Sequence, residues 1–149
     1  MKPMTVGLRV TTGGRNQARV SVRRHQFVVG RPIDFDVESS TVMALEYVLG
    51  ALGAELVGGL HEFAWRRRLV LDNVEALVQG EIEDPLVYLD VIGESGRPRI
   101  GRVDIKVYVA SPETEQIVRQ LFEDVLTKLP LVGTLRGVVH LDIQLILTA

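Results

Sequence analysis

The side chains that could do chemistry in this 149-residue sequence include no thiol, because the chain contains no cysteine. It therefore offers no thiolate nucleophile, no disulfide framework and no thiolate metal site. The three histidines, His25, His61 and His140, fall in separate predicted elements, and no second histidine follows His61 at the spacing of a helical zinc motif. No phosphate-binding loop, dinucleotide fingerprint or nucleophile elbow is present. We therefore predict neither a metal site nor a cofactor.

Two glutamates and one arginine remain as candidates. Arg15 lies in a glycine turn, whereas Glu46 and Glu55 interrupt the mostly apolar stretch Val42–Leu60. A buried glutamate is costly unless it is paired or protonated, so each must find a partner, reach solvent or line a pocket. In the structural alternative, Glu46 interacts with the dipole of a helix start and Glu55 forms an intersubunit salt bridge. Nine residues of unbroken helix are half a turn out of alignment, which would place the two glutamates on opposite sides.

Composition indicates an ordinary soluble protein with one core. Hydrophobic residues make up 46% and charged residues 24%, with a net charge of −2. This balance favours neither nucleic acid nor an anionic membrane surface as a partner. Two glutamates and four glycines argue against a membrane span over Val42–Leu60, which we interpret as a buried helix. Without a signal-peptide pattern or cysteine, the expected location is cytoplasmic.

The elements that would position these residues follow from periodicity. Period-2 alternation predicts strands, and a 3.6-residue apolar stripe predicts helices. The predicted strands are Met4–Val10, Ala18–Val22, Phe27–Val29, Val74–Ile82, Val103–Val109 and Val139–Leu147. A long helix is expected from about Thr41 to Arg66 after Ser39-Ser40, and a second helix opens at Ser111-Pro112 with Ser111 as its cap. The order of elements predicts an α+β fold, with helices on antiparallel sheet, in a single domain over residues 1–149.

Glycines in the long helix suggest a packing face. Gly50 and Gly53 share one side of the helix with Glu46, and a helix interior rarely keeps glycines without a close neighbour. We interpret this side as a packing surface and a possible dimer surface.

Three segments together resemble the OsmC/Ohr family of osmotically inducible and organic hydroperoxide resistance proteins. They are Thr12-Gly13-Gly14-Arg15-Asn16, the helix segment Leu45–Ala54 (LEYVLGALGA) and the proline segment Lys128–Arg136 (KLPLVGTLR). The resemblance implies an OsmC-like fold, with antiparallel sheets wrapped around a long central helix in an intertwined homodimer. It also implies reduction of organic hydroperoxides by a peroxidatic and a resolving cysteine, assisted by an arginine and a glutamate.

Carried over to this sequence, the assisting residues of the family fall on Arg15 and Glu46. The peroxidatic cysteine falls on Glu55 and the resolving cysteine on Leu129, so both sulfurs are missing. Peroxide reduction needs a thiolate to attack the O–O bond and a second thiol to resolve the sulfenic acid. Thiol peroxidase activity is therefore not expected. With two carboxylates near one cation, at least one glutamate should have a raised pKa or attract another cation.

Three hypotheses follow. The first is a cysteine-less OsmC-like homodimer that keeps a pocket lined by Arg15, Glu46, Glu55 and Leu129 as a binding or regulatory site, with a small-molecule ligand at the dimer interface. The second is an enzyme that uses Glu55 as a general acid or base in a partly desolvated pocket. The third is a purely structural dimer. No ligand is identified by any of them.

Overall fold

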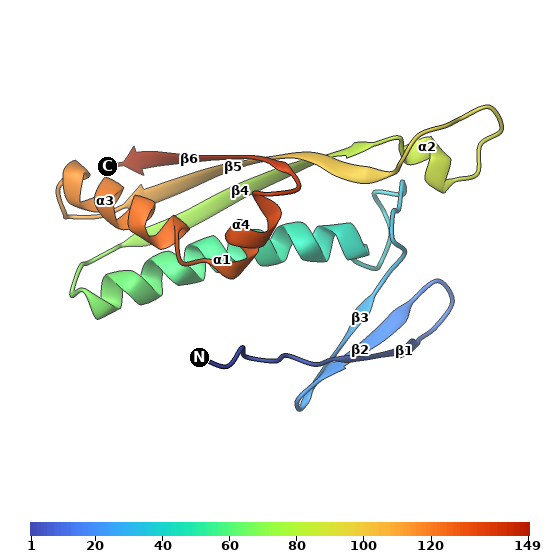
Figure 1. Ribbon diagram of the computed structural model, residues 1–149, viewed down its shortest axis with the longest axis horizontal. Coiled ribbons are helices and arrows are strands. Elements are labelled where there is room, and N and C mark those ends of the chain that lie inside the picture. Colours follow the sequence, from blue (N-terminus) through green and yellow to red (C-terminus); the bar gives the residue numbers. More distant parts are fainter. The chain divides into compact units, whose positions relative to one another are not determined.

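The computed structural model describes residues 1–149 and confirms the α+β class (Figure 1). Its elements in chain order are β1 (Arg9–Thr12), β2 (Ala18–Val22), β3 (His25–Val29), α1 (Ala44–Arg66), β4 (Asn73–Glu83), α2 (Pro85–Tyr88), β5 (Arg99–Ala110), α3 (Glu115–Leu126), α4 (Pro130–Leu135) and β6 (His140–Thr148). The chain forms two compact units, Met1–Val48 and Leu49–Ala149, each described below by itself. That the whole chain acts as a single domain stays a prediction.

The first unit contains an antiparallel sheet in the order β1-β2-β3. The first strand is shorter than the alternation predicts, because it begins at Arg9 rather than Met4. Arg9 pairs with Ser21, and β2 ends one residue later at a turn through Arg23 and Arg24, so the preceding residues have no neighbouring strand. Met4–Leu8 is consequently left as an exposed, apolar extension of β1.

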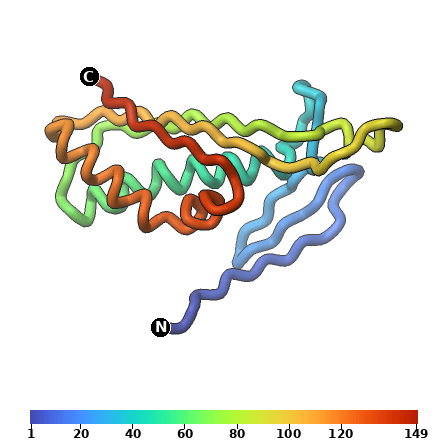
Figure 2. The backbone as a smooth tube through the Cα atoms, turned by 45° about the horizontal axis from the view of Figure 1, so that its top comes forward, coloured from blue at the N-terminus to red at the C-terminus, as the bar shows by residue number.

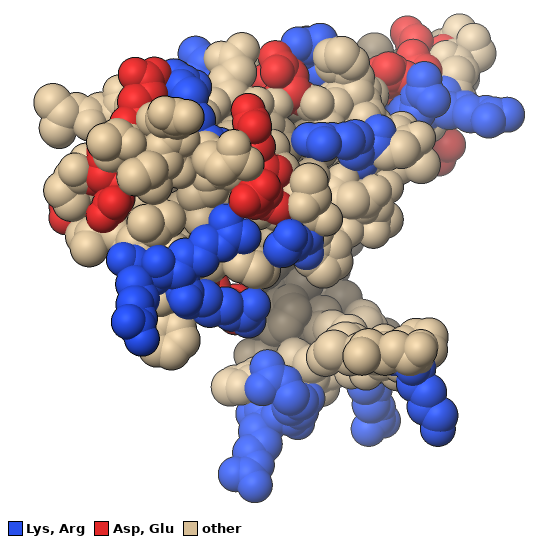
Figure 3. All heavy atoms as spheres, turned by 60° about the vertical axis from the view of Figure 1, so that its left-hand side comes forward, with Lys and Arg blue, Asp and Glu red and all other residues tan.

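Charge is distributed very unevenly between the beginning and the rest of the chain. Residues 1–33 contain seven of the 17 basic residues and none of the 19 acidic residues, so residues 34–149 contain ten basic and 19 acidic residues. Figure 3 shows the result on the β1–β3 sheet in its lower part, where blue side chains project from tan atoms without red ones. The first 33 residues thus have a net charge of +7, although the chain as a whole is slightly acidic.

The second unit is built on a sheet in the order β4-β5-β6, which corrects one expectation. β4 and β5 are antiparallel as predicted, but β5 and β6 are parallel, with Val103 opposite Leu141 and Val109 opposite Leu147. The reason is the connection: α3 and α4 carry the chain back along the sheet before β6 begins, as parallel neighbours require (Figures 1 and 2).

One face of this sheet is covered by helices and forms the core (Figure 1). The inward side chains of β5, Val103, Ile105, Val107 and Val109, are at most 1% exposed. α3 covers them with the predicted stripe, including Val118, Leu121 and Val125. At roughly 1.5–3 kcal/mol for each fully buried aliphatic side chain, this layer is the main source of stability in the unit.

The predicted glycine face of α1 is divided between two surroundings. A Cβ at Gly53 would lie 2.9 Å from Val78 Cγ2, so this glycine allows the helix to approach β4 closely. By contrast, a Cβ at Gly50 or Gly58 would meet no atom within 4 Å. Gly50, Ala54 and Gly58 recur every four residues and are all exposed, forming what we call the small-residue stripe of α1.

Two helix starts differ from the sequence prediction. α1 begins at Ala44 instead of Thr41, because the hydroxyl-rich segment before it belongs to an irregular loop. α3 is capped by Thr114, whose Oγ1 accepts a hydrogen bond from Ile117 N at 3.4 Å, rather than by Ser111. The Ser111 hydroxyl instead donates to Val70 O and accepts from Glu113 N at 3.1 Å, so it connects the β5–α3 loop to the segment after α1.

Candidate functional site

Arg15 lies at the tip of a tight turn between β1 and β2. Gly13 N donates to Gln17 O at 3.0 Å and Gln17 N donates to Gly14 O at 3.1 Å, which closes the turn. Asn16 takes a positive φ of 57°, a conformation that asparagine tolerates better than most residues. The Arg15 side chain is exposed and forms no ion pair within the chain.

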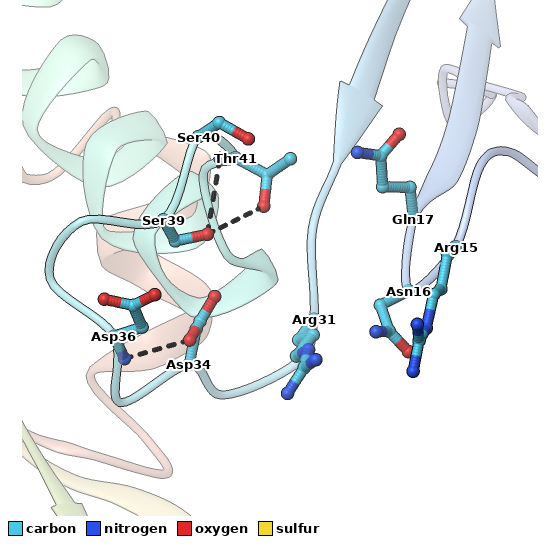
Figure 4. A pocket seen from close by; sticks show the side chains of 9 residues that line it. All are labelled: Arg15, Asn16, Gln17, Arg31, Asp34, Asp36, Ser39, Ser40 and Thr41. Carbon is cyan, nitrogen blue, oxygen red and sulfur yellow. Dashed lines mark hydrogen bonds between the residues drawn. The ribbon is translucent and has the colours of Figure 1, made fainter.

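This turn forms one wall of a polar pocket within the first unit. The pocket has a volume of about 250 Å³ and is lined by Arg15, Asn16, Gln17, Arg31, Asp34, Asp36, Ser39, Ser40 and Thr41. Figure 4 shows the β1–β2 turn on one side, the loop of residues 34–41 on the other and Arg31 between them. Two guanidinium groups and two carboxylates therefore line the same pocket.

The loop of residues 34–41 is held by its own side chains. Asp36 N donates to Asp34 Oδ1 at 3.0 Å, Glu38 N donates to Asp36 Oδ1 at 2.9 Å, and the Ser39 and Thr41 hydroxyl oxygens are 3.2 Å apart. These aspartate turns give the backbone a defined path without regular secondary structure. The hydrogen bond from Asp36 N, the Ser39 hydroxyl and the nearby Arg31 guanidinium lower the pKa of Asp34. Asp34 is therefore ionised at neutral pH.

Close backbone contacts fix the two ends of this loop. Gly30 N donates to Val42 O at 2.8 Å, and Ala44 N donates to Arg31 O at 3.2 Å. A Cβ at Gly30 would lie within van der Waals radii of the Thr41 side chain, so only glycine fits at this crossing. The backbone of Arg31 and the start of α1 are consequently held together where residues 30–31 cross residues 41–44.

Glu46 acts at the start of α1. Its Oε1 accepts a hydrogen bond from Met43 N at 3.0 Å, which satisfies one of the amide groups that a helix start leaves without a partner. The carboxylate also lies in the first turn, where the helix dipole favours negative charge. This arrangement agrees with the structural alternative for Glu46. The adjacent Tyr47 hydroxyl donates to Val28 O at 2.9 Å and joins this end of the helix to β3.

Glu55 holds the start of α4. Leu131 N donates to both of its carboxylate oxygens, at 3.1 and 2.9 Å, and Val132 N donates to Oε1 at 3.1 Å. Leu129, the residue at the cap position of α4, has an apolar side chain that cannot accept a hydrogen bond. Glu55 therefore provides the cap, from 76 and 77 residues before the two amide groups that it binds. Because both oxygens are engaged, these contacts favour a structural role for Glu55 over a general base.

Leu129 is a core residue. It is 6% exposed, and its Cδ2 lies 2.6 Å from the position that a Cβ on Gly59 would occupy. A leucine side chain has no polar atom, so this position contributes packing rather than chemistry.

The four predicted site residues are divided between the two units of the chain. Arg15 and Glu46 lie in the first unit, and Glu55 and Leu129 lie in the second. α1 is unbroken from Ala44 to Arg66, so the nine-residue separation directs Glu46 and Glu55 to opposite sides of the helix. That all four residues share one pocket stays a prediction.

Arg31 and the loop of residues 34–41 are the site residues that the sequence analysis missed. Residues 32–40 read as a polar loop and the serines as a helix cap. The usable signal was the pair of aspartates two residues apart, Asp34 and Asp36, because such residues bind the backbone two positions later. Nothing in the sequence alone placed this loop beside Arg15.

The outer face of the β4–β6 sheet carries a separate charged group. Arg102 donates to both carboxylate oxygens of Asp104 at 2.8–3.1 Å and lies 3.8 Å from Asp142. The Arg102 hydrogen bond is the main cause of the lowered pKa of Asp104. A hollow of about 380 Å³ lined by Leu77, Val78, Gln79, Asp104 and Lys106 lies beside this pair. In this group one guanidinium thus serves two carboxylates.

Neither a metal centre nor a membrane span is found. No group of three or more histidine, aspartate or glutamate side chains is close enough to hold a metal ion. No helix of the chain is both long enough and apolar enough to cross a bilayer.

Comparison with known proteins identifies the fold. No protein-family model matches the chain, and no curated protein matches its sequence. Among solved structures, an OsmC-like protein from Mycoplasma pneumoniae is similar over 99% of this chain and 98% of its own, with a TM-score of 0.78 and 15% identity. An OsmC-like protein of unknown function from Vibrio cholerae has a TM-score of 0.73 at 10% identity, over 97% of this chain and 100% of its own.

The organic hydroperoxide resistance protein OhrB of Bacillus subtilis is also similar. Its TM-score is 0.66 at 14% identity, covering 96% of this chain and 98% of OhrB. At such low identity the likeness shows a shared fold, and it confirms the OsmC/Ohr-like architecture that the three sequence segments indicated.

Proposed function

We propose that this chain is a cytoplasmic homodimer of the OsmC-like fold that binds or senses a small molecule and does not reduce hydroperoxides with its own side chains. The observation that carries this proposal is Glu55. The residue that the family resemblance aligns with the peroxidatic cysteine is a carboxylate, and three hydrogen bonds from the backbone of α4 occupy it. A carboxylate held in this way is neither a soft nucleophile nor a redox couple.

The direct test is consumption of an organic hydroperoxide with dithiothreitol as reductant. Because the chain has no thiol, we expect peroxide loss at the rate of buffer with dithiothreitol alone, and a thiol peroxidase measured in parallel gives the positive control. Turnover proportional to the concentration of this protein would contradict the proposal, since a reaction without cysteine would then have to exist.

The small-molecule role is supported by the polar pocket of the first unit. It contains Arg15, the arginine that the resemblance aligns with the assisting arginine of the family, and this side chain forms no ion pair within the chain. A chain without a thiol has no sulfur for this arginine to activate, so its guanidinium is available to a bound molecule.

Three features support the homodimer. The small-residue stripe of α1 is exposed, although such residues usually allow another backbone to approach closely. Trp65 on the same side of the helix is 80% exposed. The extension Met4–Leu8 is apolar and exposed. β1 is also an edge strand of its sheet, and native proteins usually cover or protect such edges. A second copy would cover all three features.

Charge is consistent with the same arrangement. The first 33 residues carry a net charge of +7, and residues 34–149 of a second copy offer a net charge of −9. Opposite charges of this size steer two copies together and fix their orientation more than they add affinity.

Sedimentation equilibrium tests the dimer. We expect a dimer at micromolar concentration, and we expect Ala54→Arg to be monomeric because the arginine would enter the close contact. Glu123→Arg, on the exposed side of α3, is the matched control and should remain dimeric. A wild-type protein that is monomeric at these concentrations would remove this part of the proposal.

The alternative of an enzyme with Glu55 as general base remains distinct and testable. It requires an oxygen of Glu55 to face a substrate, whereas the structure directs both oxygens to amide groups of α4. The purely structural alternative would be favoured if no small molecule bound to the pocket of the first unit.

A further inference from the structure

We propose that the pocket between the β1–β2 turn and the loop of residues 34–41 binds a small zwitterion of the amino-acid class. In this arrangement the ligand carboxylate lies against Arg15 and Arg31, and its ammonium group lies against Asp34 and Asp36. The inference rests on the proposed small-molecule role, and it is independent of both the dimer and the missing peroxidase activity.

The cationic side consists of two guanidinium groups, and that of Arg31 lies near enough to Asp34 to lower its pKa. Neither Arg15 nor Arg31 forms an ion pair with a carboxylate of the chain. Arginine binds a carboxylate through two parallel N–H donors, a geometry that lysine does not provide. The backbones of both residues are fixed, Arg15 by the closed turn and Arg31 by the hydrogen bond from Ala44 N to its carbonyl. The backbone that carries each guanidinium is therefore fixed before a ligand arrives.

The acidic side is formed by the two aspartates and nearby hydroxyl groups. Asp34 and Asp36 each use Oδ1 to accept a backbone N–H, and the Ser39 hydroxyl also hydrogen-bonds to the Asp34 carboxylate. The Ser39 and Thr41 hydroxyl oxygens line the same pocket and provide neutral acceptors. An ammonium group has three N–H donors and no acceptor, so it fits a wall of carboxylate and hydroxyl oxygens.

This pairing of charges excludes simpler ligands. An anion with no positive group would be attracted by the arginines but repelled by Asp34 and Asp36, and a simple cation would meet the reverse arrangement. An apolar molecule would displace water from the four charged side chains and would offer them no hydrogen bonds in return. A zwitterion compensates both signs, so its binding exceeds that of either half alone.

Size limits the ligand further. The volume of about 250 Å³ is below the roughly 300–1,000 Å³ of sites for drug-sized molecules. The pocket is also open to solvent, so its charged contacts are screened and its affinity modest. A ligand of about six non-hydrogen atoms in such a site is expected to bind with a Kd on the order of 1 mM.

The test is an amide NMR titration of the full chain with four probes: L-alanine, acetate, ethylammonium and inorganic phosphate. We expect L-alanine to shift the signals of residues 13–17 and 31–41 with saturation in the millimolar range. Acetate, ethylammonium and phosphate should each bind about tenfold more weakly or not at all, because each lacks one of the two charge-assisted contacts. Signals of residues 73–148 should stay in place and report that the core is intact.

Variants assign the contacts. Arg31→Gln should weaken L-alanine binding about tenfold by removing a guanidinium, and Asp34→Asn should do the same while keeping the Oδ1 acceptor of the turn. Arg24→Gln, in the exposed turn at the other end of the same sheet, is the control and should leave binding unchanged.

Each contrary result has a separate meaning. Acetate or phosphate binding as tightly as L-alanine would overturn the zwitterion and indicate an anion site, leaving the small-molecule role intact. Equal weakening by Arg24→Gln would show that general charge, rather than this pocket, attracts the ligand. Absence of shifts in residues 13–17 and 31–41 with all four probes would overturn the inference, whereas peroxide turnover or a monomeric state would refute only the proposed function.

Discussion

Replacing Glu55 tests whether a carboxylate at this position holds α4 in place. The change Glu55→Ala removes the only side chain that accepts hydrogen bonds from Leu131 N and Val132 N. Val132 is 1% exposed, so water cannot readily replace the lost acceptor at its amide group. Leu131 is only half-buried, and water can hydrate its amide group once the side chain is gone.

The expected loss of stability follows from these two amide groups. An unsatisfied buried donor costs about 1–3 kcal/mol, and loss of a helix cap costs about 0.5–2 kcal/mol. Both figures describe the same lost acceptor, so they are not added. The higher helix propensity of alanine returns about 0.4 kcal/mol. We therefore expect Glu55→Ala to lower the free energy of unfolding by about 2 kcal/mol. Glu55→Gln keeps one carbonyl acceptor and should lose about 1 kcal/mol.

Urea unfolding followed by circular dichroism measures the effect. Wild type and variants must be compared at one protein concentration, because the stability of the proposed homodimer would depend on the concentration of its protomers. In thermal unfolding, about 2 kcal/mol corresponds to a decrease of roughly 4–8 °C in Tm for a chain of this size. Glu62→Ala on the exposed side of α1 removes a carboxylate that pairs only with Arg66, and it should change stability by less than about 0.5 kcal/mol.

The reasoning fails under two results. A Glu55→Ala protein as stable as wild type would show that α4 does not depend on this carboxylate. An equal loss in Glu62→Ala would show that the cost belongs to any charge removed from α1. In either case Glu55 would again be available for a role in chemistry.

Three further predictions concern packing, capping and charge. Gly59→Ala should destabilise the wild type by about 1 kcal/mol, because its Cβ would lie 2.6 Å from Leu129 Cδ2 and the cost of overpacking, about 1–3 kcal/mol, exceeds the roughly 1 kcal/mol gained in helix propensity. The same change should be tolerated in Leu129→Ala, and a double-mutant cycle of unfolding energies measures this coupling. Thr114→Ala should cost about 1 kcal/mol in the same assay through loss of the α3 cap, and an unchanged stability would show that the 3.4 Å contact contributes nothing. The hydrogen bond from Arg67 is the largest cause of the lowered pKa of Asp124. Since the folded pKa lies below the unfolded value, this contribution to stability is present above the unfolded pKa and is lost as pH falls through the folded pKa. In a carboxyl NMR titration Arg67→Gln should raise the pKa of Asp124, and an unmoved pKa would assign the shift to other groups.

Alternation predicted which side of β4 and of β5 faces the core, whereas Val10 of β1, on the side expected to be half-buried, is 60% exposed. The buried residues of β5 are those that the period of two selected, and the proline segment became the short helix α4. The relative direction of neighbouring strands could not be predicted in this way, because alternation identifies the buried face of a strand but neither its neighbour nor the orientation of that neighbour. β6 is therefore parallel to β5, although its own pattern is equally compatible with an antiparallel pair.

The site was predictable to the extent that it depends on local pattern. Arg15 stood out because a glycine turn displays it, and Glu46 because it lies near a helix start. Its neighbours Arg31, Asp34 and Asp36 could not be assigned to the same pocket, since their proximity results from the path of the chain after β3. The partner of Glu55 was missed for a similar reason: the amide groups it binds lie 76 and 77 residues further along the chain.

The anchoring of α4 by Glu55 limits how this chain could acquire redox activity during evolution. A single change of residue 55 to cysteine would supply sulfur but would also deprive the buried Val132 amide of its acceptor, so the first step towards a peroxidase would be a less stable protein. A second change elsewhere in α4 would have to come first or at the same time. The carboxylate at residue 55 therefore opposes the introduction of sulfur at this position.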